Sequence, residues 1–285
     1  MFNFDGIKIL FGYAAKSSLM FRKIFPAILA VSLVFSAGCK KDEGVNIFTI
    51  EDDKQLGLKA KEQIAADPAQ FPVLDPVQYA DAYAYLNAIR NDILNSGKVS
   101  YKDAFPWEVH IIHQDDIQNA FCTPGGYIYV YTGLIKYLDD KSSLAGVLGH
   151  EIAHADKRHS TTQMTKQYGL QTLLDVVLGN NQGLLTQITA ELINLKFSRS
   201  DETEADKYSV TYLCPTKYHA DGAASFFQKI IDQGSATPPE FLSTHPSPDN
   251  RVENIRSQAS SQGCSTTITQ SEDVDGYAAF KAMLP

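Results

Sequence analysis

The five residues His150-Glu151-Ile152-Ala153-His154 constrain the fold of this chain more than any other feature of its sequence. Positions four apart share one face of an α-helix, so a helix here lets both imidazoles reach a single ion. Glu151 lies about 100° round the helix, where it can hydrogen-bond a water on that ion instead of binding the ion itself. The H-E-x-x-H pattern is the signature of a zinc hydrolase, although an amphipathic helix with two incidental histidines would also show it.

The residues around this motif predict a buried helix over 141–157. Asp139, Asp140 and Ser142 are candidate N-caps at its start. Apolar side chains recur at helical spacing within it, namely Leu144, Val147, Leu148 and Ile152. Imidazoles on a buried helix need partners, and a shared metal ion would satisfy both of them together.

A catalytic zinc site with two histidines needs a third protein ligand and an open position for water. The acidic stretch from Asp201 to Asp206 offers candidates on a long helix predicted over 183–213. Glu202 and Asp206 are four apart and share a face, which suits a carboxylate ligand followed by a carboxylate that orients a ligating histidine. Glu204 is a competing candidate ligand, and an ordinary acidic face exposed to solvent would give the same pattern.

Four segments together resemble a known family of enzymes. They are Asn119-Ala-Phe-Cys-Thr-Pro-Gly-Gly126, the His150–His154 motif, Phe197-Ser-Arg-Ser-Asp-Glu-Thr-Glu-Ala-Asp206, and Ser243-Thr-His-Pro246 with Arg251. In this order they are similar to segments of the membrane-associated zinc endopeptidases related to the CAAX prenyl protease, HtpX and the mitochondrial Oma protease. The chain looks like a single-domain bacterial lipoprotein branch of that family. Cys122 and Ser209 depart from the family pattern, but neither touches the proposed ligands.

The resemblance implies roles for individual residues. Glu202 would be the third zinc ligand beside His150 and His154, with Asp206 behind a ligating histidine. The segment Asn119, Ala120 and Phe121 would bind substrate.

His245 is the least certain residue of the predicted site, and the resemblance places it beside the metal. Pro246 biases its backbone toward an extended conformation just ahead of a helix. There His245 would stabilise the oxyanion of the tetrahedral intermediate, or bind zinc as a fourth ligand and hold the enzyme latent. The third alternative is a surface histidine in a loop.

The N-terminal residues predict export. A basic pair, Arg22-Lys23, precedes an apolar run from Ile24 to Phe35 that is too short to span a bilayer comfortably. Ser36-Ala37-Gly38-Cys39 follows and resembles a bacterial lipobox, although an ordinary cleaved signal with an incidental cysteine is the alternative. We expect Met20 to be the true start.

The expected organisation is a signal peptide over residues 1–38, a tether over 39–48 and a zinc metallopeptidase domain over 49–285. Acylated Cys39 would hold the protein in the cell envelope, on the periplasmic face of the outer membrane or at the cell surface.

Composition and periodicity favour one globular domain that does not bind nucleic acid, because the net charge of −8 comes with no basic stripe. Further helices are expected at 51–66, 77–94, 133–138, 160–178, 219–233 and 248–260, and strands at 107–113 and 127–131. The predicted fold class is α+β, mainly helical, with a zincin-like core and a small antiparallel sheet. An edge strand of that sheet could bind extended substrate by adding it to the sheet.

The remaining cysteines and histidines are expected outside the metal site. Cys214 and Cys264 are the preferred disulfide pair of an exported protein, with Cys122 left over, although connectivity cannot be deduced from sequence. The other histidines are expected in structural, surface or capping positions: His110, His113, His159 and His219.

Together, these expectations predict a membrane-anchored endopeptidase with one Zn²⁺ per chain. Glu151 would take a proton from water and deliver it to the leaving amine. Substrates would be envelope or misfolded proteins, with envelope assembly machinery as a partner. A non-catalytic, zinc-stabilised scaffold or chaperone for envelope assembly is the main alternative. The presence of Glu151 argues against it, because a structural zinc site needs no general base.

Overall fold

A computed structural model describes residues 48–234, 239–247, 249–267 and 276–285. Every described residue belongs to one compact unit, Gly44–Pro285. The predicted signal peptide, Cys39 and nearly all of the predicted tether lie outside the described residues. Within the described ranges, no helix combines the length and the apolar character needed to cross a membrane.

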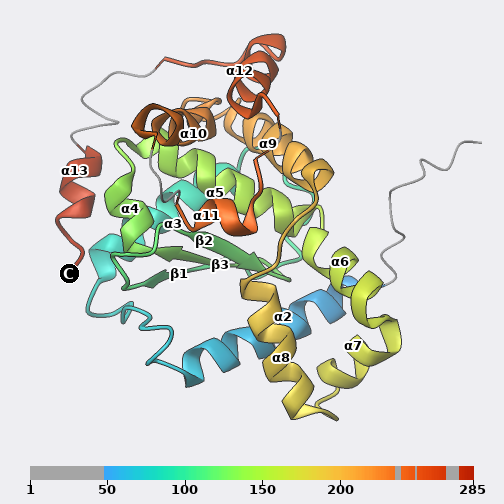
Figure 1. Cartoon of the computed structure of the whole chain (residues 1–285). Helices are drawn as coiled ribbons and strands as arrows, with labels where there is room; N and C mark the ends of the chain where they lie inside the picture. The colour runs from blue at the N-terminus through green and yellow to red at the C-terminus, as the bar shows by residue number, and fades with distance from the viewer. Residues whose placement is uncertain (1–47, 235–238, 248, 268–275) are drawn as a thin grey trace, which may run out of the picture. The chain divides into compact units, whose positions relative to one another are not determined.

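Helices make up most of the described structure, which confirms the mainly helical α+β class (Figure 1). In chain order they are α2 (Ile50–Ala66), α3 (Ala80–Leu94), α4 (Thr132–Tyr137), α5 (Lys141–Asp156), α6 (His159–Tyr168), α7 (Leu170–Val177), α8 (Gln182–Ile193), α9 (Arg199–Leu213), α10 (Gly222–Gln233), α11 (Phe241–Thr244), α12 (Arg251–Ser261) and α13 (Gly276–Lys281).

The sheet has the strands β1 (Glu108–Ile112), β2 (Ala120–Thr123) and β3 (Tyr127–Tyr131), in the order β1-β3-β2. It is mixed, so the prediction of a wholly antiparallel sheet was wrong. β2 and β3 form an antiparallel hairpin, but β1 pairs in parallel with the other side of β3. The turn residues determine only the hairpin, whereas the place of β1 depends on packing between distant segments.

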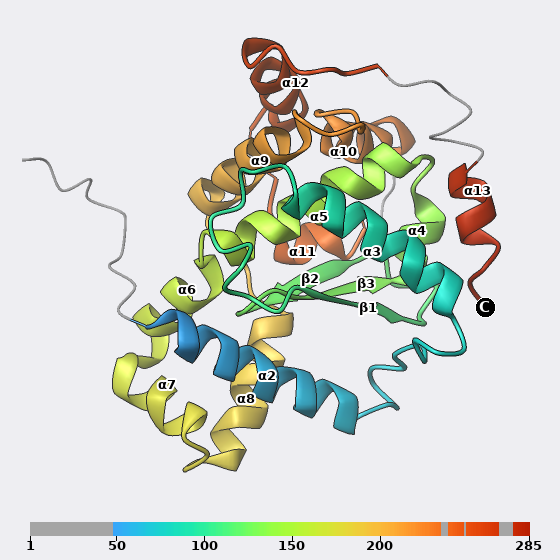
Figure 2. The same ribbon diagram turned by 180° about the vertical axis from the view of Figure 1, so that it is seen from behind.

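Both faces of the sheet are covered, so all five residues of β3 are buried. Helices α3 and α5 lie on one face and α2 and α8 on the other, as Figure 2 shows from behind. Side chains alternate along a strand. Ile128 and Val130 therefore join the core under α5, whereas Tyr127, Tyr129 and Tyr131 join a second apolar cluster with Ile64 of α2 and Ile193 of α8.

Helix α5 carries the H-E-x-x-H motif and is buried along nearly its whole length, as its apolar stripe predicted. Asp140 is the N-cap, and its side chain accepts a hydrogen bond from the Ser143 amide at 2.6 Å. Helices α9 and α10 pack against α5. The Ser209 hydroxyl on α9 donates to the Gly146 carbonyl at 2.8 Å, so this departure from the family pattern adds a contact between the two helices.

Two long predicted helices are each broken into two. The segment 160–178 forms α6 and α7, separated at Gly169, whose φ of 77° is unfavourable for other residues. The segment 183–213 forms α8 and α9, separated by residues 194–198. Ser198 starts α9 with a capping box that it shares with Asp201. Apolar spacing persists through both breaks, which is why periodicity alone predicted continuous helices.

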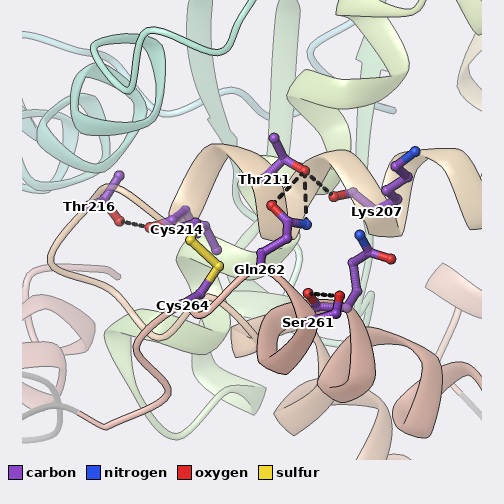
Figure 3. The surroundings of a disulfide bond; sticks show 9 residues. Lys207, Thr211, Cys214, Thr216, Ser261, Gln262 and Cys264 are labelled. Carbon is purple, nitrogen blue, oxygen red and sulfur yellow. Dashed lines mark hydrogen bonds between the residues drawn. A yellow bond between two sulfur atoms is a disulfide. The ribbon is translucent and has the colours of Figure 1, made fainter.

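A disulfide joins Cys214 and Cys264, as predicted (Figure 3). Cys214 caps the C-terminal end of α9, and Cys264 follows α12. The Gln262 side chain also hydrogen-bonds the Thr211 hydroxyl at 3.3 Å, so the two helix ends are held by more than the covalent bond. Cys122 is a free, buried thiol.

Candidate metal centre

Three parts of the chain bring four side chains into one buried cluster. Helix α5 contributes His150 and His154, α9 contributes Glu202, and His245 follows α11. One ligand atom from each of them lies within 4.8 Å of all the others. All four side chains are at most 1% exposed, so without a metal ion several polar atoms would share a space that water does not reach.

The distances within this cluster suit a tetrahedral zinc ion. The Nε2 atoms of His150 and His154 lie 3.0 Å apart, and Nδ1 of His245 lies 3.3 Å from Nε2 of His150. Oε1 of Glu202 lies 3.3 Å from Nε2 of His154 and 3.0 Å from Nδ1 of His245. Bonds of roughly 2.0–2.1 Å around a tetrahedral ion place neighbouring ligand atoms about 3.3 Å apart. The donor set therefore fits zinc.

A second layer of charged groups holds these ligands. Nδ1 of His150 lies 3.0 Å from the Asp206 carboxylate, so Asp206 contacts this one of the two motif histidines. The Arg251 guanidinium in turn donates to Asp206 at 2.7 and 2.8 Å and to Glu202 at 2.9 Å. Arg251 is 3% exposed and joins α12 to α9. The resemblance of the H-P-x-x-x-x-R segment included Arg251, but nothing in the local pattern indicated these partners.

His159 lies behind the other motif histidine, so its assignment as a solvent-facing or capping residue was wrong. Its Nδ1 is 2.9 Å from Nδ1 of His154, and its Nε2 is 3.1 Å from the Glu204 carboxylate. Arg158 adopts a left-handed conformation with φ of 58°, which turns the chain so that His159 returns toward α5. Glu204 thereby points away from the cluster, whereas the competing candidate Glu202 lies within it.

Glu151 is buried completely, and neither of its carboxylate oxygens has a hydrogen-bond partner among the described residues. Nε2 of His245 lies 3.5 Å from Oε1 of Glu151. Burial raises the pKa of Glu151 above its usual value. A buried carboxylate without a partner is costly, so its position beside the ligand atoms indicates a function that requires it there.

The charges of the cluster favour a cation. Burial disfavours a charged imidazole, but the carboxylates of Glu202 and Asp206 outweigh burial and raise the pKa of His150 to about 9. Burial alone would raise the pKa of Glu202, yet the neighbouring His245 and His150 lower it well below its usual range. Burial lowers the pKa of His154, which keeps it in the neutral form that binds metals.

His245 is 1% exposed, which excludes the surface-loop alternative. Its ring stacks on Phe241 with centroids 4.2 Å apart, and its backbone amide donates to the Phe241 carbonyl at 2.8 Å. The ring is therefore fixed with Nδ1 among the ligand atoms and Nε2 toward Glu151.

Ala120 and Phe121 begin β2, which lies at the edge of the sheet, and Asn119 directly precedes it. The Tyr131 amide donates to the Asn119 carbonyl at 3.1 Å. Because hydrogen-bonded and outward-facing pairs alternate in an antiparallel ladder, the backbone groups of Ala120 and Cys122 point away from β3. The other predicted structural or surface histidines stay outside the cluster: His110 stacks on Tyr129, His113 is exposed, and His219 is half-buried.

Two histidines one helical turn apart, a glutamate from a second helix and a buried carboxylate beside them are the arrangement of zinc-dependent peptidases. Comparison with known proteins agrees. The model of peptidase family M48 matches residues 80–259, so the chain belongs to this family.

Relatives of known name share this region. The chain is 31% identical over 191 residues to the beta-barrel assembly-enhancing protease of Yersinia pestis, covering 61% of this chain and 38% of that protein. It is 34% identical over 154 residues to the mitochondrial metalloendopeptidase OMA1 of Arabidopsis thaliana, covering 53% of this chain and 31% of that protein. The chain therefore spans about a third of the length of these curated relatives.

Proposed function

We propose that this protein is a zinc-dependent endopeptidase. The observation that carries the proposal is Glu151, a fully buried carboxylate with no hydrogen-bond partner among the described residues, beside a donor set of zinc-binding geometry. A structural zinc site would need the ligands but not this carboxylate. The family membership supports the same reaction.

In this mechanism His150, His154 and Glu202 hold the zinc ion. When bound, zinc polarises the scissile carbonyl and lowers the pKa of water. Glu151 accepts a proton from the attacking water and delivers it to the leaving amine, and its raised pKa suits both steps. Asp206 and Arg251 keep the ligands oriented through the bonds described above.

The position of His245 is compatible with two roles. Its Nδ1 lies close enough to the other donors to act as a fourth ligand that holds the enzyme latent. With that ligand displaced, an N–H donor on the same ring would stabilise the developing oxyanion. Higher turnover of His245→Ala would indicate latency, and lower turnover with zinc retained would indicate oxyanion stabilisation.

We further propose that substrate binds in an extended conformation along β2. The backbone groups of Ala120 and Cys122 point away from β3, and an incoming strand would pair with them once the buried edge opens. The Ala120 amide donates to Oδ1 of the preceding residue, Asn119, at 2.9 Å. An incoming strand would replace this contact.

The site of action that fits the N-terminal sequence is the bacterial cell envelope. We propose that Cys39 is acylated and anchors the protein, and that its substrates are envelope or misfolded proteins. The relative from Yersinia pestis is named for beta-barrel assembly, which supports an association with envelope assembly machinery. The anchoring proposal requires Cys39→Ser protein to leave the membrane fraction. Retention there would indicate an uncleaved signal anchor instead.

A non-catalytic scaffold stabilised by zinc remains the alternative, and one experiment separates it from the proposed function. The purified protein should contain one zinc ion per chain, cleave an unfolded protein, lose cleavage after chelation and regain it with added zinc. A folded, zinc-containing protein that cleaves no peptide bond in any of several unfolded proteins would favour the scaffold.

A further inference from the structure

A cavity of about 440 Å³ lies at the N-terminal end of β2. Asn119 and Tyr131 form part of its wall, Ile193 and Asn194 come from the end of α8, and Glu240 precedes α11. None of the metal-centre residues lines it. It is therefore a separate feature that the hydrolytic mechanism does not use.

Two segments connect this cavity to the metal centre. Residues 194–198 lead from the cavity to Phe197, whose ring stacks on His154 with centroids 3.8 Å apart. Helix α11 leads from Glu240 to His245, and the Phe241 amide holds this helix against β2 by donating to the Gln118 carbonyl at 3.1 Å. A peptide extended along β2 with its scissile bond at the metal would thus place a side chain near the cavity.

The charge of the cavity is negative. Asp116 and Glu240 belong to its lining, and neither forms a salt bridge with a basic residue in the described part of the chain. Among the described lining residues there is no lysine, arginine or histidine; the others are apolar or uncharged polar side chains. Oε1 of Glu240 accepts a hydrogen bond from the Ser243 hydroxyl at 2.5 Å, but carboxylates without a basic partner around a cavity still favour a positively charged occupant.

Two polar side chains in the wall are more than nine-tenths buried, and each keeps a polar atom that no described protein group pairs with. Asn119 and Tyr131 are each only 5% exposed. Oδ1 of Asn119 accepts from Ala120, but within the described ranges no protein group pairs with its Nδ2 or with the Tyr131 hydroxyl. Burial and the nearby charge of Glu240 raise the pKa of Tyr131 to about 12, so its hydroxyl stays neutral. Neither atom is among the fully buried polar atoms of the described residues that lack a partner, so both face the space of the cavity, where a ligand can hydrogen-bond to them.

We propose that this cavity is a specificity pocket that binds a lysine or arginine side chain of the substrate. Asp116 and Glu240 attract the cationic group, the Tyr131 hydroxyl accepts from it, and the Asn119 amide donates to a substrate carbonyl. The proposal rests on the proposed peptidase function and adds a substrate class to it.

The test uses peptides in which each position within four residues of the scissile bond carries lysine or, in a matched peptide, methionine, which is uncharged and of similar length. Two quantities are measured for each pair: kcat/KM with the wild-type enzyme, and Kd with the inactive variant Glu151→Gln. At one position lysine should be favoured about three- to tenfold in both quantities. Asp116→Asn and Glu240→Gln should each bring that ratio toward one.

Asp103→Asn is the matched control, because Asp103 is an exposed carboxylate outside the cavity lining. It should leave the lysine-to-methionine ratio unchanged. The pocket proposal is overturned if no position favours lysine, or if the ratio survives Asp116→Asn combined with Glu240→Gln. If no peptide is cleaved but binding to Glu151→Gln still favours lysine, the result supports the pocket proposal and contradicts the peptidase function.

Discussion

At the scale of single residues, the metal centre depends on what each imidazole contacts with its second nitrogen. His150 uses Nδ1 to contact Asp206, and His154 uses Nδ1 to contact His159. Such outer contacts fix the tautomer and orientation of a ligand. The two motif histidines therefore differ: a carboxylate supports one and a neighbouring imidazole supports the other.

Replacing His159 tests this difference. His159→Ala removes the group that orients His154, so we expect zinc affinity to fall by roughly 10- to 100-fold. Glu204→Ala is the comparison variant, and its effect should be smaller because the Glu204 side chain is 48% exposed and only supports His159. Zinc affinity is measured by competition with a chelator. Equal affinity of His159→Ala and wild type would show that His154 needs no such support.

The candidate ligands and Asp206 were predictable from sequence, whereas the contacts of His159 and Arg251 were not. His150, His154 and Glu202 follow from spacing within single helices and from the family resemblance. His159 is buried only because the left-handed residue Arg158 reverses the chain, and Arg251 reaches α9 only through tertiary packing. Neither effect leaves a periodic signal in the sequence.

At the scale of elements, α9 and α10 have to pack closely against α5 for its histidines to reach the other ligands. Gly146 lets α10 approach α5, because a Cβ at this position would lie 2.1 Å from the Ala223 amide nitrogen. How well each element was predicted from sequence depends on whether local residues or distant contacts determine it. The buried stripe of α5 and the β2–β3 hairpin are local features, whereas the parallel pairing of β1 and the break before Ser198 depend on distant contacts.

Gly146→Ala should destabilise the fold, because the added methyl meets backbone that cannot move aside as a side chain would. We expect a loss of about 1–3 kcal/mol in the free energy of unfolding, measured by chemical denaturation. Gly183→Ala is the matched control, since Gly183 is exposed on α8 with no atom nearer than 3.9 Å to an added Cβ. That control should be neutral or stabilise by up to ~1 kcal/mol. Equal destabilisation by both changes would contradict close packing of α5 and α10.

At the scale of the whole molecule, the centre joins residues from His150 to Arg251, and the disulfide closes the segment that carries two of them. Cys214 and Cys264 are separated by 50 residues, and His245 and Arg251 lie between them. Closing this loop reduces the entropy of the unfolded chain and holds α12 near the end of α9.

Removing the disulfide should therefore lower stability and loosen the metal site together. For the double variant Cys214→Ala with Cys264→Ala we expect a loss of roughly 2–4 kcal/mol and a fall in Tm of about 5–15 °C. Thermal unfolding of wild-type protein with and without reductant supplies the control, and the reduced form should match the variant. A Tm that is insensitive to reductant would show that the cross-link does not stabilise the fold.

The central claim is that Glu151 acts as a base and not as a ligand, and one paired measurement on Glu151→Gln tests it. Zinc content is determined by atomic absorption, and cleavage of an unfolded protein is followed in the same sample. We expect one zinc ion per chain, as in wild type, with cleavage reduced at least about 10²-fold, because the uncharged amide cannot take a proton. Full cleavage by zinc-loaded Glu151→Gln would contradict the mechanism, and loss of zinc from this variant would place Glu151 among the ligands.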